Sequence, residues 1–171
     1  MQAELAARLA ELGIAPADLL ARGLEIHAEP AELALAETNA EGREFHLVPA
    51  ASAAWRAMRA AAAEEGVEIF LLSAFRSVAR QHEIVAAKLA RGQSLDEILR
   101  VSAAPGFSEH HTGCAVDIGA PDSPPLGEAF EATAAFGWLS RRAAAFGFHL
   151  SYPRGNASGY LYEPWHWRWR A

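Results

Sequence analysis

The sequence predicts an α+β fold in which helices pack on a small, mainly antiparallel sheet. Helical periodicity and helix-boundary residues indicate helices over residues 52–66, 80–90, 94–100 and 128–145. Short apolar or alternating segments indicate strands over residues 67–75, 115–118, 148–152, 160–162 and 165–169. The chain of 171 residues is long enough to form one domain with its own core.

Residues 45–171 are expected to form the main domain. The first 44 residues are expected to form a helical arm that packs on this domain. Leu5, Leu9 and Leu12 follow helical spacing, and a second short helix is expected between Pro16 and Gly23. Between residues 24 and 49, prolines and a glycine interrupt short apolar runs, which indicates loops with short strands.

Several later elements have recognisable boundaries. Ser52 is a suitable N-cap for a helix that ends at Gly66, and residues 94–97 form a capping-box pattern. Residues 67–75 are nearly all apolar, which predicts a strand covered on both faces. The strands at 148–152 and 160–162 flank a turn-rich segment and are expected to pair.

Composition argues against several classes of partner. The net charge is -6 and the basic residues form no stripe along the sequence, so nucleic acid is not an expected partner. No segment approaches about 20 apolar residues, so no transmembrane segment is expected. The N-terminus lacks a signal-peptide pattern, which predicts a cytoplasmic chain as given, or a cell-envelope one if an export signal was removed. The sequence leaves the oligomeric state open.

Three widely separated polar residues are candidate metal ligands. His110 and Asp117 flank a segment that contains a glycine, and His166 lies far downstream, so the fold must bring them together. Two imidazole nitrogens and one carboxylate oxygen suit tetrahedral zinc with a fourth position open to water. Glu163 is an odd number of positions from His166, but Pro164 allows a kink that brings both to one site. Its carboxylate could accept a proton from the water and deliver it to a leaving amine.

A purely structural interpretation competes with each half of this pattern. A single histidine or aspartate is more often a surface or hydrogen-bonded residue than a ligand, so either half alone is weak. The two halves together are much more specific. His82 and Glu83 do not form the helical His-Glu-x-x-His zinc motif, because Ala86 occupies the second histidine position.

The combined pattern resembles the zinc D-alanyl-D-alanine carboxypeptidases and dipeptidases, which are grouped with lysostaphin-type enzymes and the hedgehog signalling domain. The family pattern is Ser-x-His-x-x-Gly-x-Ala-x-Asp followed by Glu-x-x-His, and it is complete here in Ser108, His110, Gly113, Ala115, Asp117, Glu163 and His166. The resemblance implies a Zn²⁺ ion held by His110, Asp117 and His166, with Glu163 as general base and acid.

A second matching segment lies upstream. Residues 73–77 and Gln81 are similar to the Ser-Gly-Tyr-Arg-Ser segment of the family. The resemblance implies that Arg76 stabilises the developing oxyanion or holds substrate, and that Gln81 contacts substrate. Ser108, two residues before a ligand and expected on the same strand face, is a candidate contact for a terminal carboxylate.

The chain also departs from the family at two positions. His111 stands where the carboxypeptidase branch often has glutamine, and it is expected to be exposed, with support of a metal ligand as the alternative. Phe75 replaces a tyrosine, which removes a hydroxyl group. Cys114 is expected to face the core as a small buried residue.

The predicted function is a zinc-dependent carboxypeptidase that hydrolyses peptidoglycan stem peptides of the D-Ala-D-Ala type. Zinc and Arg76 would polarise the scissile carbonyl, and Glu163 would activate the water. Two alternatives share this chemistry, namely an L,D-carboxypeptidase and a peptidoglycan endopeptidase. A third belongs to another class, a non-catalytic zinc-containing module that binds cell-wall or peptide ligands, and the intact Glu163 argues against it.

Overall fold

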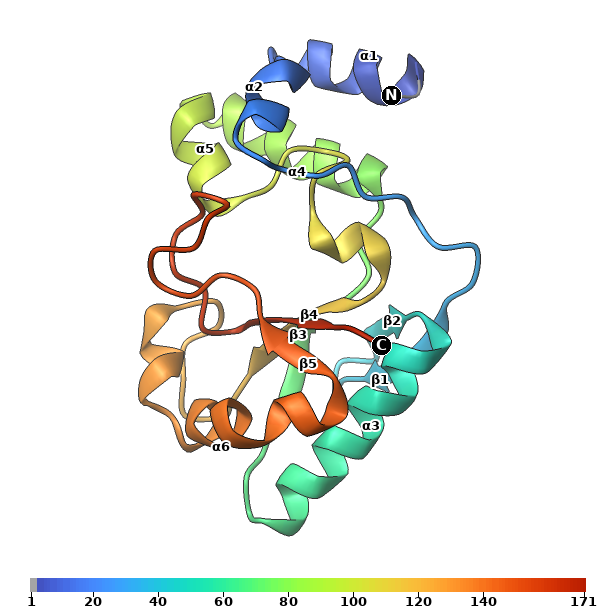
Figure 1. Cartoon of the computed structure of the whole chain (residues 1–171), viewed down its shortest axis with the longest axis vertical. Helices are drawn as coiled ribbons and strands as arrows, with labels where there is room; N and C mark the ends of the chain where they lie inside the picture. Colours follow the sequence, from blue (N-terminus) through green and yellow to red (C-terminus); the bar gives the residue numbers. More distant parts are fainter. Residues whose placement is uncertain (1–2) are drawn as a thin grey trace.

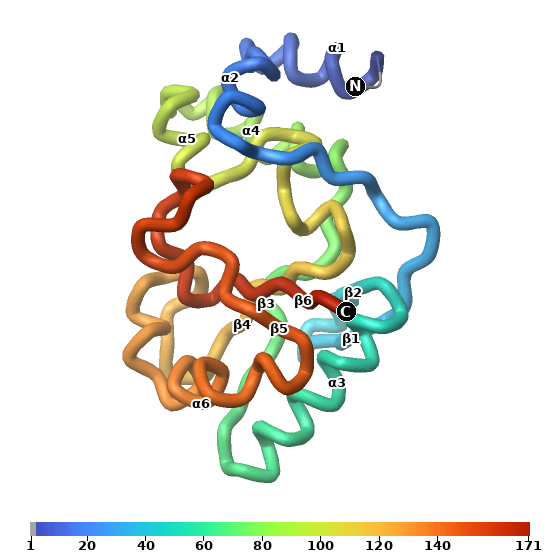
Figure 2. Tube along the Cα trace, in the orientation of Figure 1, coloured from blue at the N-terminus to red at the C-terminus, as the bar shows by residue number. Residues whose placement is uncertain are grey.

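The computed structural model describes residues 3–171 and confirms the α+β fold (Figure 1). The central sheet has the spatial order β3-β4-β6-β5, and every neighbouring pair is antiparallel. Its strands are β3 (Phe70–Ser73), β4 (Ala115–Gly119), β6 (His166–Trp169) and β5 (Phe148–Leu150). The last strand of the chain, β6, therefore lies inside the sheet, and the chain trace shows it running through the middle of the molecule (Figure 2).

One hydrophobic core lies between the central sheet and the helices α3 (Pro49–Glu64) and α6 (Ala134–Arg142) (Figure 1). The short 3-10 helices η2 (Glu128–Ala132) and η3 (Ala143–Phe146) flank α6. The largest fully buried side chains of this core are Trp55, Trp138, Phe130 and Phe148. Burial of each such side chain contributes roughly 1.5–3 kcal/mol, so this core holds the sheet in place.

A second core lies on the opposite side of the sheet, among α1 (Ala3–Glu11), α2 (Pro16–Ala21), α4 (Val78–Ala90) and α5 (Leu95–Val101) (Figure 1). Leu9 and Leu19 from the N-terminal helices pack there with Val85, Ile98 and Phe107. β1 (Ala34–Thr38) pairs with β2 (Glu44–Leu47) across the expected boundary at residue 44, and the division of the chain at that point stays a prediction. No helix in the described part of the chain is long and apolar enough to cross a membrane.

Two helix predictions differ from the structure at their boundaries. The helix expected from Ser52 begins at Pro49, with Val48 as N-cap, because proline is well suited to the first helical turn. Ser52 lies inside the helix and donates a hydrogen bond to the Leu35 carbonyl at 2.9 Å. The helix expected over residues 128–145 is divided into η2, α6 and η3, because Thr133 is extended and caps α6.

The strand predictions were correct in part. The strand expected over residues 67–75 is limited to β3. Among the helix signals, the capping box at residues 94–97 is confirmed. The hairpin expected between residues 148–152 and 160–162 is wrong, because β5 pairs with β6 and residues 160–162 form no strand. The competing partner was the tryptophan-rich C-terminal strand, whose Trp167 enters the first core.

Candidate metal centre and active site

Three different elements bring the predicted ligands together. His110 lies on the 3-10 helix η1 (Glu109–Thr112) rather than on a strand, Asp117 lies in the middle of β4, and His166 begins β6. Asp117 and His166 are direct partners in the antiparallel register. One ligand atom from each residue lies within 4.8 Å of the other two, and all three side chains are buried. The structure thus gathers the three residues that the sequence singles out.

Hydrogen bonds determine which nitrogen of each histidine faces the cluster. The Nδ1–H group of His110 donates to the Ala74 carbonyl at 2.8 Å. Its Nε2 is buried without a hydrogen-bond partner among the described residues, 3.2 Å from Asp117 Oδ2. His166 uses Nε2–H to donate to Glu109 Oε2 at 3.0 Å, and its Nδ1 lies 3.0 Å from Asp117 Oδ1. A shared cation would resolve this convergence of lone pairs, so the donor set fits a divalent metal.

The pKa of His166 reflects the same arrangement. Burial by itself lowers this pKa, but the hydrogen bonds to Asp117 and Glu109 outweigh burial and raise it to about 10. Burial likewise opposes ionisation of Asp117, whereas His110 and His166 hold the pKa of its carboxyl well below the usual range. A divalent cation would take the place of the proton on Nδ1 and satisfy the same carboxylate.

Glu163 lies beside the cluster, as the kink at Pro164 suggested. Its carboxylate Oε2 is 3.8 Å from His166 Nδ1, and 15% of the side chain is exposed to the cleft. Backbone bonds fix this segment, because Glu163 N–H donates to Tyr152 O and His166 N–H donates to Glu163 O, both at 3.1 Å. Burial raises the pKa of Glu163 to about 7, while His166 and Asp117 act in opposite directions. A carboxyl group of this kind can both accept and return a proton.

Arg76 lines the cleft beside the cluster, and a hydrogen bond from its backbone N–H fixes its position. Its N–H donates to the His110 carbonyl at 3.2 Å, and its Nη2 lies 3.4 Å from Ser108 Oγ. Its Nε has no hydrogen-bond partner within residues 3–171, and burial lowers the pKa of the guanidinium. Ser108 is buried and caps η1 through its hydroxyl, which accepts from His110 N–H. Both side chains line the cleft, in position to meet a substrate.

His111 is buried, so the expectation that it is exposed is wrong. Its Nδ1–H donates to the Arg76 carbonyl at 2.6 Å, and its Nε2 accepts from Gly106 N–H at 3.0 Å. Burial lowers its pKa to about 4, so the ring is neutral at pH 7 and both nitrogens are satisfied. His111 therefore fixes the backbone that carries Arg76.

Two other predicted residues occupy different surroundings from those expected. Gln81 is buried on α4 and donates from Nε2 to the Ala103 carbonyl at 2.6 Å, behind the residues that line the cleft. Its role as a substrate contact stays a prediction. Cys114 is partly exposed rather than buried in the core, because it precedes β4 and its thiol lies near the Thr112 carbonyl.

Glu109 is a site residue that sequence reasoning missed. Its Oε2 accepts from Ser151 Oγ–H at 2.6 Å as well as from His166, and its Oε1 accepts from Arg168 Nη1–H at 3.0 Å. Burial opposes its ionisation, but the bond to His166 leads the contributions that lower its pKa to about 2. Its place between Ser108 and His110 was the only sequence signal, since its partners come from residues 151–168.

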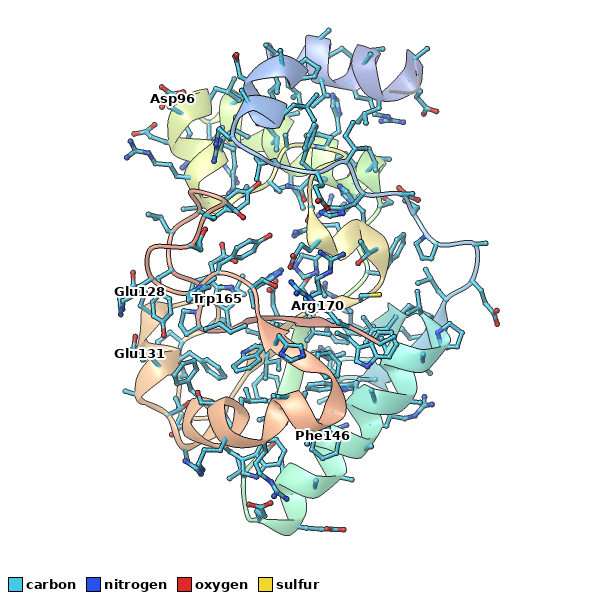
Figure 3. The ribbon with its side chains drawn as sticks, viewed as in Figure 1. Asp96, Glu128, Glu131, Phe146, Trp165 and Arg170 are labelled. Carbon is cyan, nitrogen blue, oxygen red and sulfur yellow. The ribbon has the colours of Figure 1, made fainter. Side chains whose placement is uncertain are left out.

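A cleft of about 440 Å³ opens beside the cluster. Its floor includes the three candidate ligands and Glu163, and its walls come from α4, the segment after α5, and the loops around residues 126–128 and 152–165. Glu128 and Trp165, both labelled in Figure 3, also line the cleft. The cleft is large enough for a short peptide to reach the buried cluster.

This combination of an antiparallel sheet, two histidines and an aspartate, and a carboxylate beside them is the arrangement of a metal-dependent peptidase. Residues 44–171 match the model of the VanY family, described as D-alanyl-D-alanine carboxypeptidase, and the chain belongs to that family.

Similarity to named proteins and solved structures supports this assignment. A protein of Bacillus subtilis (strain 168) named putative carboxypeptidase YodJ is 37% identical over 123 residues, which cover 70% of this chain and 44% of that protein. The chain thus spans less than half the length of this relative. The LdcB LD-carboxypeptidase structure has a TM-score of 0.74 and 32% identity, covering 84% of this chain and 70% of that one.

Two VanY structures are also similar. A VanY mutant in complex with Zn(II) has a TM-score of 0.62 and 29% identity, covering 84% of this chain and 83% of that one. VanYB in complex with D-alanine-D-alanine has a TM-score of 0.64 and 30% identity, covering 83% and 81%. These relatives share the fold that carries the candidate site.

Proposed function

We propose that the protein is a zinc-dependent carboxypeptidase that hydrolyses peptidoglycan stem peptides ending in D-Ala-D-Ala. The observation that carries this proposal is the buried set of His110, Asp117 and His166 with Glu163 beside it in an open cleft. The family and the VanY structures bound to Zn(II) and to D-alanine-D-alanine support the metal and the substrate class.

The residues present would hold zinc through His110 Nε2, one Asp117 oxygen and His166 Nδ1, with a fourth position left for water. When bound, zinc acts as a Lewis acid and lowers the pKa of water. Glu163 would accept the proton of the attacking water and return it to the leaving amine. Arg76 would donate to the scissile carbonyl as negative charge develops on its oxygen. Ser108 would contact the substrate beside Arg76.

Metal analysis and one substitution test this proposal. Purified protein is expected to contain about one zinc per chain. Glu163→Ala should retain the metal and lose hydrolysis by orders of magnitude, because it removes the proton carrier and none of the three ligands. A Glu163→Ala variant that cleaves stem peptides at the parent rate would refute the mechanism.

The structural similarity to LdcB favours L,D-carboxypeptidase activity as the second candidate function. Both activities need the same zinc site and differ in the stereochemistry of the bond that is cut. Mass spectrometry of digests of defined pentapeptides and tetrapeptides separates them. Loss of the terminal D-alanine from the pentapeptide supports the first candidate, loss of D-alanine from the tetrapeptide supports the second, and internal cleavage identifies an endopeptidase.

A further inference from the structure

One wall of the cleft carries a lysine that the proposed mechanism does not use. On α4, Ile84 and Lys88 lie one turn apart and line the cleft, while Gln81 and Val85, which neighbour them on the helix, are buried. The hydrogen bond from Gln81 to the Ala103 carbonyl ties the segment after α5 to this helix. The wall is therefore a supported structure rather than a loose surface loop.

Lys88 is held at this wall by a neighbouring hydroxyl. Its Nζ donates to Ser102 Oγ at 2.5 Å, and both residues are half-buried in the cleft lining. Among residues 3–171 no carboxylate forms an ion pair with it. Burial, followed by the positive charges of Arg76 and Arg91, lowers the pKa of Lys88, and only Glu163 acts in the other direction.

The charges around the cleft leave a place for an anion. Arg76 also lacks an ion-pair partner among the described residues, and Glu128 in the cleft lining is already paired with Arg154 at 3.2 Å. Two cations thus line the cleft without an ion pair to a carboxylate of residues 3–171, although Asp117 and Glu163 act on Arg76, and Glu163 on Lys88, from a longer distance. A partly desolvated cation costs free energy until a ligand supplies the opposite charge.

We propose that Lys88 and Ser102 form a subsite that binds a carboxylate of the substrate. The inference rests on the proposed peptidase function and adds a specificity determinant to it. An ammonium and a hydroxyl can donate together to one carboxylate, and charge-assisted bonds of this kind are among the stronger ones in proteins. The carboxylate comes either from the free C-terminus of the peptide or from an acidic side chain further along it.

Matched peptides and three variants test the subsite. Each peptide is made as the C-terminal acid and the C-terminal amide, and with its side-chain carboxylate free or amidated. The parent, Lys88→Met, Lys88→Arg and Ser102→Ala are compared by kcat/KM. Lys88→Met should lower kcat/KM for the recognised acid roughly 10- to 100-fold, mainly through KM, and leave the amide almost unchanged. Lys88→Arg should retain most of the preference, and Ser102→Ala should lose part of it.

The peptide pair that responds identifies the source of the carboxylate. Loss of the acid-over-amide preference at the C-terminus assigns the subsite to the terminal carboxylate, and loss at the side chain assigns it to the side-chain carboxylate. An equal effect of Lys88→Met on acid and amide in both pairs would overturn the proposal, while hydrolysis that still requires Glu163 would leave the peptidase function intact.

Peptide binding without turnover covers the case in which the parent hydrolyses none of these peptides. Calorimetry compares acid and amide binding to Glu163→Ala and to the double variant Glu163→Ala, Lys88→Met. A preference for the acid that disappears in the double variant supports the subsite even if the reaction is different. Equal affinities in both proteins contradict it. Unchanged zinc content of Lys88→Met shows that the metal centre is intact.

Discussion

At the scale of single residues, the site depends on which histidine nitrogen is available. His166 has carboxylate oxygens 3.0 Å from both of its nitrogens, and the bond from Nε2–H to Glu109 leaves Nδ1 available to the proposed metal. Such outer carboxylates orient a ligand and increase its basicity. Ser151 and Arg168 hold Glu109 in turn, so the orientation of one ligand depends on residues from two other segments.

Glu109→Ala is expected to weaken zinc binding about 10- to 100-fold, because His166 loses the partner that fixes its tautomer. Competition with a chromogenic chelator measures the affinity, and nitrogen NMR of the His166 ring shows whether Nε2 remains protonated. Glu64→Ala, at an exposed position of α3, is the matched control and should bind zinc as the parent does. Parent-like affinity in Glu109→Ala would contradict this role.

His111 illustrates how one residue type can replace another. The buried neutral ring offers a donor to Arg76 O and an acceptor to Gly106 N–H. A glutamine side chain likewise carries a donor NH2 group and an acceptor carbonyl oxygen a short distance apart. This equivalence explains why histidine can stand where the carboxypeptidase branch often has glutamine. The difference is that histidine titrates.

The pH dependence of stability should therefore differ between the parent and His111→Gln. Burial lowers the folded pKa of His111 to about 4, while the unfolded value is about 6.5. Its contribution to stability is fully present above about pH 6.5 and is lost as pH falls towards 4. Between pH 7 and 4 the metal-free parent should lose up to about 3 kcal/mol more than His111→Gln. Urea unfolding of both proteins in a chelator measures this difference, and parallel pH profiles would exclude it.

At the scale of elements, η1 depends on the glycine that ends it. Gly113 has φ of +66°, and a Cβ there would lie 3.1 Å from Val48 Cγ1 and 3.2 Å from the Val48 backbone nitrogen. Gly113 O also accepts from Val48 N–H at 2.9 Å. Gly113 therefore allows η1, which carries His110, to sit against the start of α3.

Gly113→Ala is expected to destabilise the protein more than Gly92→Ala does. Both glycines have positive φ, but Gly92 has open space where a Cβ would be placed, so it reports backbone strain alone. We expect about 1 kcal/mol for Gly92→Ala and 1–3 kcal/mol more for Gly113→Ala. Chemical unfolding of the metal-free proteins measures both values. Equal losses would show that the close contact at Gly113 relaxes without cost.

The same scale shows what the sequence could and could not predict. Local signals were sufficient for the capping box at residues 94–97 and for the helical arm, because caps and spacing act over a few residues. The partner of β5 was not predictable, because a strand with apolar residues on one face accepts several partners until the whole sheet forms. The candidate ligands could be selected as residue types in a motif. The Asp117–His166 register and the Glu109 network join residues 42 to 59 positions apart, and no local pattern encodes them.

At the scale of the whole molecule, the site lies where two cores meet. The sheet and its core supply Asp117 and His166, whereas the cleft wall carried by α4 belongs to the second core. η1 begins two residues after Phe107 of the second core and is bonded to the sheet side, since His110 Nδ1–H donates to the Ala74 carbonyl after β3 and His110 Nε2 lies 3.2 Å from Asp117 on β4. A metal that binds His110, Asp117 and His166 would therefore crosslink η1, β4 and β6.

Removal of zinc should accordingly lower the stability of the whole protein and not of the site alone. A ligand that binds only the folded state at 100 times its dissociation constant adds about 2.7 kcal/mol, so chelation should lower the melting temperature by several degrees. Calorimetry with a chelator, and again after zinc is restored, measures the change. Asp117→Ala is the decisive control, because it removes one ligand and should make the melting temperature insensitive to both additions. An equal response of this variant would mean that zinc stabilises the fold from another position.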